Sequence, residues 1–133
     1  MPTFHLQIAT PDRQAYDGAA EKLIVRAEGG DVCILANHID YATPLGIGEA
    51  RVTDAQGNTR VAACNGGLLS VRDNQVRLMA ITFEWQDEID LDRARQAEAA
   101  AQEKLSAIRR EDRDFSLAEA KLKRAITRIH VKG

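Results

Sequence analysis

The sequence has few cysteines, no long hydrophobic run and no signal peptide. Its two cysteines, Cys33 and Cys64, are too few for a disulfide framework in 133 residues and are predicted to be buried thiols in a reducing compartment. The longest apolar run, Val32–Ala36, is far too short to cross a membrane. The N-terminus lacks the basic flank and apolar stretch of a secretion signal. We therefore expect a soluble, intracellular protein that reaches a membrane only through a partner.

Motifs for three kinds of chemistry are also missing. No Gly-rich loop ends in Gly-Lys-Ser/Thr, which excludes a P-loop nucleotide hydrolase, and Gly66-Gly67 is predicted to be a turn leading into a strand. Cys33, Cys64 and His38 lack the paired short spacing of metal ligands, so no metal site is predicted. The few His, Ser and Cys residues offer no nucleophile with a base and an orienting group. We predict a protein that is not an enzyme.

The net charge of −2 hides an uneven distribution of charge along the chain. Residues 87–103 carry six acids against two arginines, whereas residues 121–133 carry five basic residues and no acid. The basic segment favours an acidic protein surface or a nucleic acid as its partner. No aromatic residue follows Phe115 to stack on bases, so we expect no nucleic-acid partner.

The first two thirds of the chain have the pattern of short strands. Phe4, Leu6 and Ile8 alternate with polar residues and stop before Pro11. Turn signals then recur about every ten residues, at Gly29-Gly30, Gln56-Gly57-Asn58 and Asp73-Asn74. Many short strands joined by turns are typical of an antiparallel β-sandwich.

From Asp90 onward there is no proline, and no glycine until Gly133, and the apolar period changes to three and four residues. Asp90 is predicted to cap a first helix, and Ser116 with Glu119 has capping-box spacing for a second. The predicted apolar stripes are Leu91, Ala94, Ala97, Ala101, Leu105 and Ile108, then Ala118, Leu122, Ala125, Ile126 and Ile129. A short polar link makes the helices antiparallel, so the fold class is α+β, a β-sandwich followed by an α-helical hairpin. Such alanine-rich stripes bury little area, so the hairpin must dock on another surface.

The hairpin geometry brings the start of its first helix level with the end of its second. Arg93 then lies opposite Arg128, and Arg124 projects from the same face as Arg128. Surface ion pairing with Asp90 is one interpretation of this convergence. The other is a phosphate site, because arginine forks suit phosphate oxygens and the first helix offers its N-terminus.

Four segments together resemble the ε subunit of F-type ATP synthases over essentially the whole chain. They are the opening strand and turn "MPTFHLQIATPDRQAYDG", the central "VCILANHIDYATPLGIGEARV", the strand pair "NGGLLSVRDNQVRLMA" and "IDLDRA", which fits an Ile/Leu-Asp-x-x-Arg-Ala signature. The resemblance implies a sandwich of about ten strands (1–84) that binds the γ subunit and the c-ring. It also implies a hinge (85–89) and a regulatory hairpin (90–133).

The resemblance further implies a rotor subunit whose extended hairpin reaches the catalytic α and β subunits and inhibits ATP hydrolysis. It places the protein on the cytoplasmic face of a bacterial inner membrane, with no required cofactor. ATP is the implied regulatory ligand, and the matching positions are Glu84, Ile89, Asp90, Arg93, Arg124 and Arg128. Partner contacts are implied for Asp31, His38 and Tyr41. A stand-alone ATP-sensing protein is the alternative function.

Overall fold

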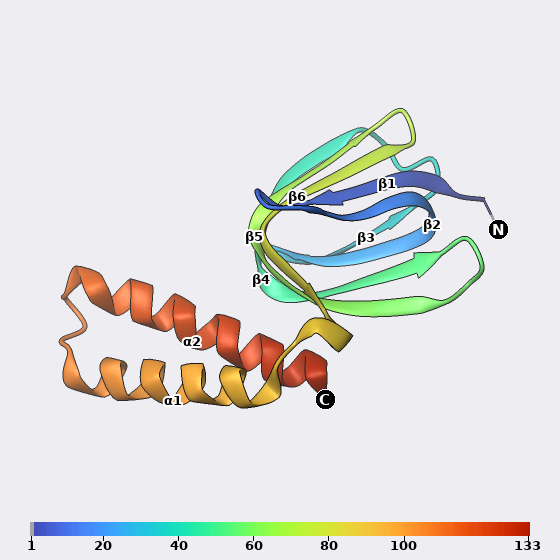
Figure 1. Cartoon of the computed structure of the whole chain (residues 1–133). Helices are drawn as coiled ribbons and strands as arrows, with labels where there is room; N and C mark the ends of the chain where they lie inside the picture. Colours follow the sequence, from blue (N-terminus) through green and yellow to red (C-terminus); the bar gives the residue numbers. More distant parts are fainter. Residues whose placement is uncertain (1) are drawn as a thin grey trace.

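The computed structural model describes residues 2–133 and contains six strands followed by two long helices. The strands are β1 (Phe4–Ala9), β2 (Gln14–Ala27), β3 (Gly30–Leu35), β4 (Tyr41–Asp54), β5 (Thr59–Arg72) and β6 (Gln75–Trp85). A 3₁₀ turn, η1 (Gln86–Glu88), leads into α1 (Leu91–Ala107) and α2 (Arg113–Lys132). Figure 1 shows the strands gathered in one body and the helices side by side below it. The predicted α+β fold class is confirmed.

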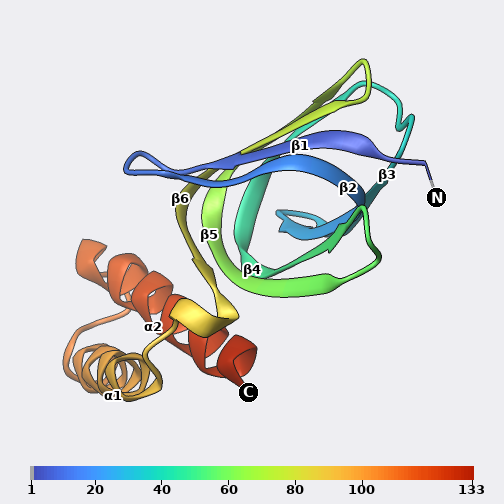
Figure 2. The same ribbon diagram turned by 45° about the vertical axis from the view of Figure 1, so that its right-hand side comes forward.

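The strands form one sheet of order β1-β6-β5-β4-β2-β3, and β1 also pairs with β2. This extra pairing closes the sheet into a barrel, and β3 pairs with the second half of β2, beyond the residues that pair with β1. Figure 2 shows β4 and β5 curving around the barrel. Each long, bent strand takes part in both layers of the predicted sandwich. A strand that would count twice in a sandwich is therefore one strand here, and the structure has six strands where about ten were implied.

One pairing differs from the antiparallel pattern. β1 runs parallel to β6, with Leu6 opposite Val76 and Ile8 opposite Leu78. The alternation of Phe4, Leu6 and Ile8 is confirmed, since all three side chains are at most 2% exposed in the barrel core. β1 thus lies between β2 and β6 and buries one face completely.

The predicted turns lie where the strands reverse. Asp73 and Asn74 both have positive φ, 51° and 61°, as a two-residue hairpin turn requires. Gly66-Gly67 was expected before a strand, and this prediction is wrong because β5 runs through both residues. Gly67 has a φ of 126°, and a Cβ there would lie 2.0 Å from the carbonyl oxygen of Met79. The glycine pair therefore lets β6 approach β5 closely.

The two helices pack through alanines and are capped by aspartates. Ala94 and Ala101 of α1 are buried, as are Ala118 and Ala125 of α2. The Asp90 carboxylate accepts a hydrogen bond from the Arg93 backbone N–H at 3.1 Å, which confirms the predicted cap.

The predicted second cap and parts of the stripes are wrong. α2 begins at Arg113, because Asp112 rather than Ser116 caps it by accepting from the Asp114 N–H at 2.9 Å. Ala97 is exposed because it lies beside a hollow between the helices. Ile126 is 46% exposed, since it lies on the outer side of α2.

The hairpin contacts the barrel near the end of α2. Val131 packs with Ala63 of β5 and Ile89 of the hinge in a small buried cluster. Gln86 donates a hydrogen bond from Nε2 to the Val131 carbonyl at 2.9 Å, and Lys132 donates to the Gln86 carbonyl at 3.2 Å. Most of both helices projects away from the barrel (Figure 1).

Candidate functional site

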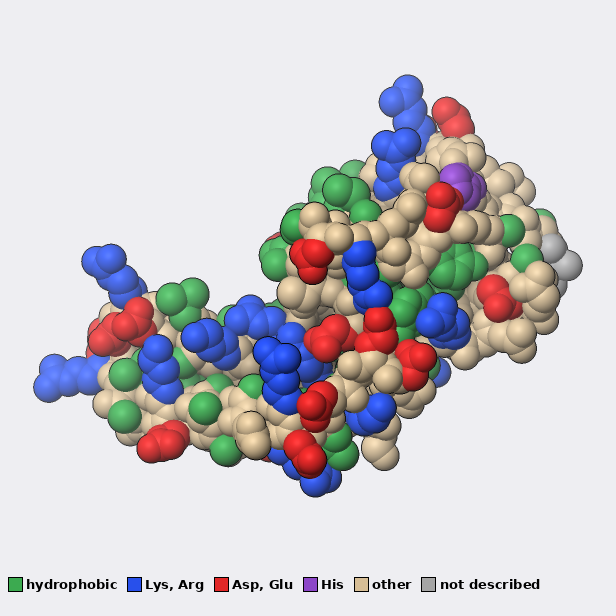
Figure 3. All heavy atoms as spheres, in the orientation of Figure 1, with side chains coloured by type: hydrophobic (Ala, Val, Ile, Leu, Met, Phe, Trp, Pro, Cys, Tyr) green, Lys and Arg blue, Asp and Glu red, His purple; other side chains and the backbone are tan. Residues whose placement is uncertain are grey.

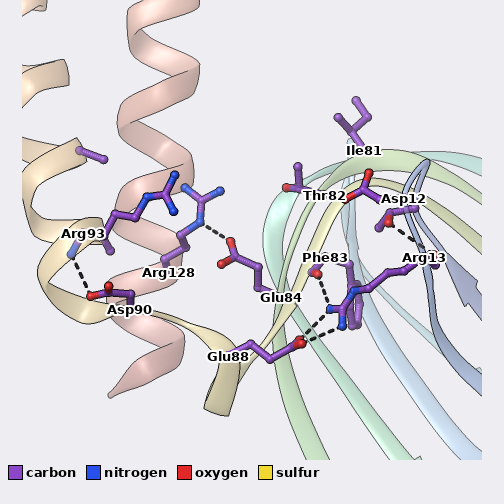
Figure 4. Close-up of a pocket in the computed structure, with 13 residues that line it drawn as sticks. Asp12, Arg13, Ile81, Thr82, Phe83, Glu84, Glu88, Asp90, Arg93 and Arg128 are labelled. Carbon is purple, nitrogen blue, oxygen red and sulfur yellow. Dashed lines mark hydrogen bonds and ion pairs between the residues drawn. The ribbon is translucent and has the colours of Figure 1, made fainter.

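A cavity of about 600 Å³ lies where the hairpin meets the barrel. We call it the joint cavity. Its wall comes from the β1–β2 turn, β6, η1 and both helices, so neither the barrel nor the hairpin alone encloses it. It is lined by Thr10, Asp12, Arg13, Ile81, Thr82, Phe83, Glu84, Glu88, Asp90, Arg93, Ala94, Ala97 and Arg128. Figure 4 shows the charged members of this set converging from opposite sides.

One ion pair crosses the joint cavity from the barrel to the hairpin. The Nε of Arg128 donates to Oε1 of Glu84 at 2.5 Å. Both side chains are half-buried, with 24% and 32% of their surface exposed, so water screens this pair less than a pair on an open surface. Arg93 lies beside Arg128 and points the same way (Figure 4). The two guanidinium groups thus present donors in one place, and the Glu84 carboxylate lies between Arg128 and the barrel.

A second ion pair joins the barrel to the hinge. Arg13 donates through Nη1 and Nη2 to both carboxylate oxygens of Glu88, each at 2.7 Å. Arg13 also donates to the Phe83 carbonyl at 3.1 Å, and Glu88 accepts from the Trp85 backbone N–H at 2.9 Å. We call this four-residue set the hinge clasp. It fixes the position of η1 against the β1–β2 turn.

The hinge clasp shifts the pKa of both of its charged groups. The hydrogen bonds from Arg13 lower the pKa of the Glu88 carboxyl below its usual value, and desolvation opposes this effect. The pKa of Arg13 is raised, first by its hydrogen bonds to Glu88. Both groups are therefore charged at neutral pH, and the clasp is an ion pair.

Beside the joint cavity lies a second hollow of about 340 Å³ between α1 and α2. We call it the basic groove. Its floor is made of alanines and its rim of lysines and arginines. It is lined by Ala97, Ala100, Ala101, Lys104, Ala118, Lys121, Arg124 and Arg128. Ala97 and Arg128 line both hollows, so the two are contiguous.

The structure brings most of the predicted ligand residues together. Glu84, Asp90, Arg93 and Arg128 line the joint cavity, whereas Arg124 lines the basic groove next to it. Ile89 lines neither hollow, because its side chain is buried against Ala63 and Val131. The predicted ligand residues are thus divided between two contiguous hollows, and Ile89 lies instead in the buried cluster that holds the hairpin against the barrel, which we call the dock.

Sequence reasoning missed the contribution of the β1–β2 turn. Thr10, Asp12 and Arg13 follow the first strand and carry no motif. Glu88 belongs to the acidic run that precedes α1, but its partner is 75 residues away. The one signal in the sequence is the excess of acidic residues before α1, which indicates that a basic residue elsewhere in the chain pairs with them.

The residues expected at partner contacts lie away from the joint cavity. Asp31 on β3 accepts from Nε of Arg26 at 2.6 Å, and the His38 and Tyr41 rings are 5.8 Å apart. His38 belongs to the loop between β3 and β4, at the end of the barrel opposite the hairpin (Figure 1). This loop is held to the β5–β6 turn by a hydrogen bond from the Asn37 N–H to Asn74 at 2.7 Å.

The cysteines differ from each other in environment. Cys64 is buried as predicted, and burial raises the pKa of its thiol to about 12. Cys33 is exposed, so the prediction of a buried thiol is wrong there. It lies on β3, where alternate side chains face outward and Ile34 faces the core. Among residues 2–133, no group of three or more His, Cys, Asp or Glu side chains is placed to hold a metal ion.

No helix within residues 2–133 is long and apolar enough to span a membrane.

Comparison with known proteins identifies two adjoining family domains. Residues 3–86 match the domain described as ATP synthase, Delta/Epsilon chain, beta-sandwich domain, and residues 87–133 match its long alpha-helix domain. Proteins named ATP synthase epsilon chain from Halalkalibacterium halodurans, Bacillus pumilus and Bacillus velezensis are 37%, 39% and 41% identical to the chain. Each alignment covers 100% of this chain and 99% of the relative.

Solved structures show the same fold at low sequence identity. A chain in the Euglena gracilis mitochondrial ATP synthase (OSCP, F1 and c-ring) matches with a TM-score of 0.79 at 20% identity, over 92% of this chain and 78% of that one. A chain in the Tetrahymena thermophila mitochondrial ATP synthase central stalk and c-ring matches with a TM-score of 0.67 at 10% identity, over 97% and 96%. These structures share the fold, and the two family domains together with the full-length relatives show that the chain belongs to the ATP synthase delta/epsilon chain family.

Proposed function

We propose that the chain is the ε subunit of a bacterial F-type ATP synthase, a central-stalk rotor subunit that regulates ATP hydrolysis through its helical hairpin. Full-length relatives named ATP synthase epsilon chain support this assignment. The observation that carries the regulatory part is the joint cavity, whose wall is shared between the barrel and the hairpin. A ligand in this cavity contacts both parts and holds them together.

ATP is the ligand that this cavity suits best. Arg93 and Arg128 offer planar donors for phosphate oxygens, and the first turn of α1 adds its N-terminal dipole. Glu84 and Asp90 are acceptors for a base amino group or ribose hydroxyls. Because Glu84 already forms an ion pair with Arg128, a phosphate must displace this carboxylate to bind Arg128.

Calorimetric titration of the full chain with ATP tests this binding. Arg93→Ala removes a guanidinium that lines the cavity and is expected to weaken ATP binding by roughly tenfold or more. Arg95→Ala is the matched control, because Arg95 lies on the same helix but outside the cavity. Equal affinity of the two variants for ATP contradicts the site. ATP should also slow proteolysis of the hairpin, since it binds only the docked form.

An exposed apolar surface on the barrel supports partner binding. Pro44, Leu68 and Met79 are neighbours across β4, β5 and β6, and Ile81 follows Met79 on the same face. Leu68, Met79 and Ile81 are 49%, 56% and 68% exposed. Figure 3 shows hydrophobic side chains gathered on this side of the barrel. Such a patch is typical of a protein interface, so we assign it to the γ subunit.

We further assign to the c-ring Asp31 on β3, His38 in the loop between β3 and β4, and Tyr41 at the start of β4. The membrane is then reached only through the complex, on its cytoplasmic face. Met79→Glu is expected to abolish co-purification with a γ subunit, while Arg72→Glu, at the exposed end of β5, leaves it intact. Retained γ binding by Met79→Glu refutes this face as the interface.

The basic residues of α2 suit an acidic surface on the catalytic β subunits once the hairpin extends. Reconstituted complexes provide the test. Hydrolysis of ATP should rise when the full chain is replaced by one that ends at Asp90, and coupling to the membrane should remain. Unchanged hydrolysis argues against inhibition by the hairpin.

A further inference from the structure

The connection between the barrel and the hairpin is tied to the barrel at both ends of η1. Glu88, the last residue of η1, accepts from Nη1 and Nη2 of Arg13 at 2.7 Å each and from the Trp85 backbone N–H at 2.9 Å. The Trp85 indole N–H donates to the Ala15 carbonyl of β2 at 3.2 Å. Figure 4 shows Glu88 turned toward Arg13, while Asp90 lies on the side of the helices. Within the connection, η1 therefore belongs to the barrel.

The contacts of α2 with the same connection come from the last turn of the helix. Gln86 donates from Nε2 to the Val131 carbonyl at 2.9 Å, and Lys132 donates to the Gln86 carbonyl at 3.2 Å. Val131 also packs on Ile89 in the dock. These contacts join α2 to the outer side of η1, and none of them holds η1 on the barrel. Departure of α2 breaks them and leaves the hinge clasp intact.

Two torsion angles between η1 and α1 can change at little cost. On the η1 side, the Ile89 N–H donates to the Gln86 carbonyl at 3.4 Å. On the α1 side, the Asp90 carbonyl accepts from the Ala94 N–H at 3.0 Å, and its carboxylate accepts from the Arg93 N–H at 3.1 Å. The ψ of Ile89, 127°, and the φ of Asp90, −88°, lie between these two sets. Rotation about them therefore breaks none of these hydrogen bonds.

We propose that the hinge clasp fixes the pivot of the hairpin at Ile89-Asp90, so that η1 stays on the barrel when the hairpin leaves its dock. The inference rests on the proposed function, in which the hairpin moves. At no more than about 3.6 Å per residue, the Cα of Leu91 then stays within about 11 Å of that of Glu88, whereas a hinge free from Trp85 onward allows about 22 Å. The hairpin thus turns about a fixed point and returns to the same dock.

Hydrogen exchange of the Trp85 backbone amide, measured by NMR on the full chain, tests the proposal. This amide donates to Glu88, so its exchange rate reports whether the hinge clasp is closed. Val131→Asp places a charge in the dock and should speed proteolysis of the hairpin by roughly tenfold or more. Trp85 exchange should change by less than about twofold in this variant, because η1 stays in place. Ile126→Asp, at an exposed position on α2, is the matched control and should alter neither rate.

Removal of the hinge clasp is the complementary test. In the double variant Arg13→Ala/Val131→Asp, Trp85 exchange should rise by roughly tenfold or more, because the charged hydrogen bonds that hold Glu88 are lost. Arg13→Lys in the same background should restore part of the protection, since an ammonium group still pairs with the carboxylate. Circular dichroism verifies that each variant retains its helices, and Val131→Ala weakens the dock without a buried charge where Val131→Asp does not fold.

Failure of the pivot and failure of the mobile hairpin give different results. Fast proteolysis of the hairpin together with fast exchange at Trp85 in the Val131 variants means that η1 leaves with the hairpin. This result overturns the pivot and leaves a mobile hairpin in place. Unchanged proteolysis in both Val131 variants overturns the mobile hairpin and the pivot together. Unchanged exchange at Trp85 after the loss of Arg13 shows that the hinge clasp does not hold η1, and it also overturns the proposal.

Discussion

Alanine substitution of Arg13 and Glu88, singly and together, measures how strongly the hinge clasp holds η1 against the barrel. The side chains are 42% and 37% exposed, so solvent screens the pair. The bidentate geometry places its coupling near the upper end for exposed pairs, at about 1 kcal/mol. Each side chain also makes one hydrogen bond to the backbone, worth about 1 kcal/mol.

These contributions predict that the effects of the two substitutions on the unfolding free energy are not additive. Each single variant should lose about 2 kcal/mol of unfolding free energy, and the double variant about 3 kcal/mol rather than 4. Urea unfolding followed by the fluorescence of Trp85 is the assay, because this is the only tryptophan and it lies within the clasp. Trp85 is 4% exposed and the guanidinium carbon of Arg60 lies 3.8 Å from its ring centroid, so loosening of the contact between η1 and the barrel changes its surroundings.

The stability contributed by the hinge clasp should decrease at low pH. Arg13 lowers the pKa of Glu88 in the folded state, so the clasp contributes fully above the unfolded value of about 4.3. The contribution is lost as the pH falls through the lowered folded pKa. A control cycle uses Arg72 and Asp73, whose closest charged atoms are 3.9 Å apart on the open surface. A coupling below about 0.3 kcal/mol at pH 7, or one as large as that of the control, refutes the reasoning.

Three further predictions concern the barrel and the dock. Gly67→Ala should prevent folding or cost more than about 3 kcal/mol by denaturation, because a Cβ clashes with a carbonyl oxygen of β6. The pKa of His5 is raised, first through its hydrogen bond to Asp17. Its contribution to stability is therefore present below about pH 6.5 and is lost as the pH rises through the folded pKa. The unfolding free energy of His5→Gln should lack this pH dependence. Val131→Ala should weaken the dock by about 1.5 kcal/mol and speed proteolysis of the hairpin roughly tenfold, whereas Ile126→Ala, at an exposed position, should leave it unchanged.

Several features set by residues close in sequence were predicted correctly. Asp90 caps α1 through a backbone group three residues away, and Asp73-Asn74 turns the chain between adjacent strands. The barrel core follows from alternation along single strands. In each case the pattern and the interaction lie within the same short segment, so the sequence contains all the information that is needed.

Features that depend on distant pairing were not predictable. The parallel contact of β1 with β6 leaves no mark on the alternation within either strand. Arg13 meets Glu88 only because the barrel closes. Which side chains of β3 face outward depends on how this strand pairs with β2, so the apolar run around Cys33 does not reveal that Cys33 is exposed while Ile34 is buried. For the candidate site, the helix positions of Arg93 and Arg128 were predictable from the hairpin, but the β1–β2 turn that completes the joint cavity was not.

The free energy that holds the hairpin in its dock against the barrel determines whether a ligand can control the hairpin's position. Burial of Val131 contributes about 2 kcal/mol, and the contacts of Gln86 with Val131 and of Arg128 with Glu84 about 1 kcal/mol each. A ligand at about one hundred times its Kd adds about 2.7 kcal/mol to the docked state, which is comparable with the dock itself. Phosphate binding to Arg128 breaks the ion pair with Glu84, so the proposed ligand must gain more from Arg93 and Arg124 than it loses at this pair. A ligand bound to the barrel alone favours neither state; the shared wall of the joint cavity is therefore the feature that couples ligand binding to the position of the hairpin.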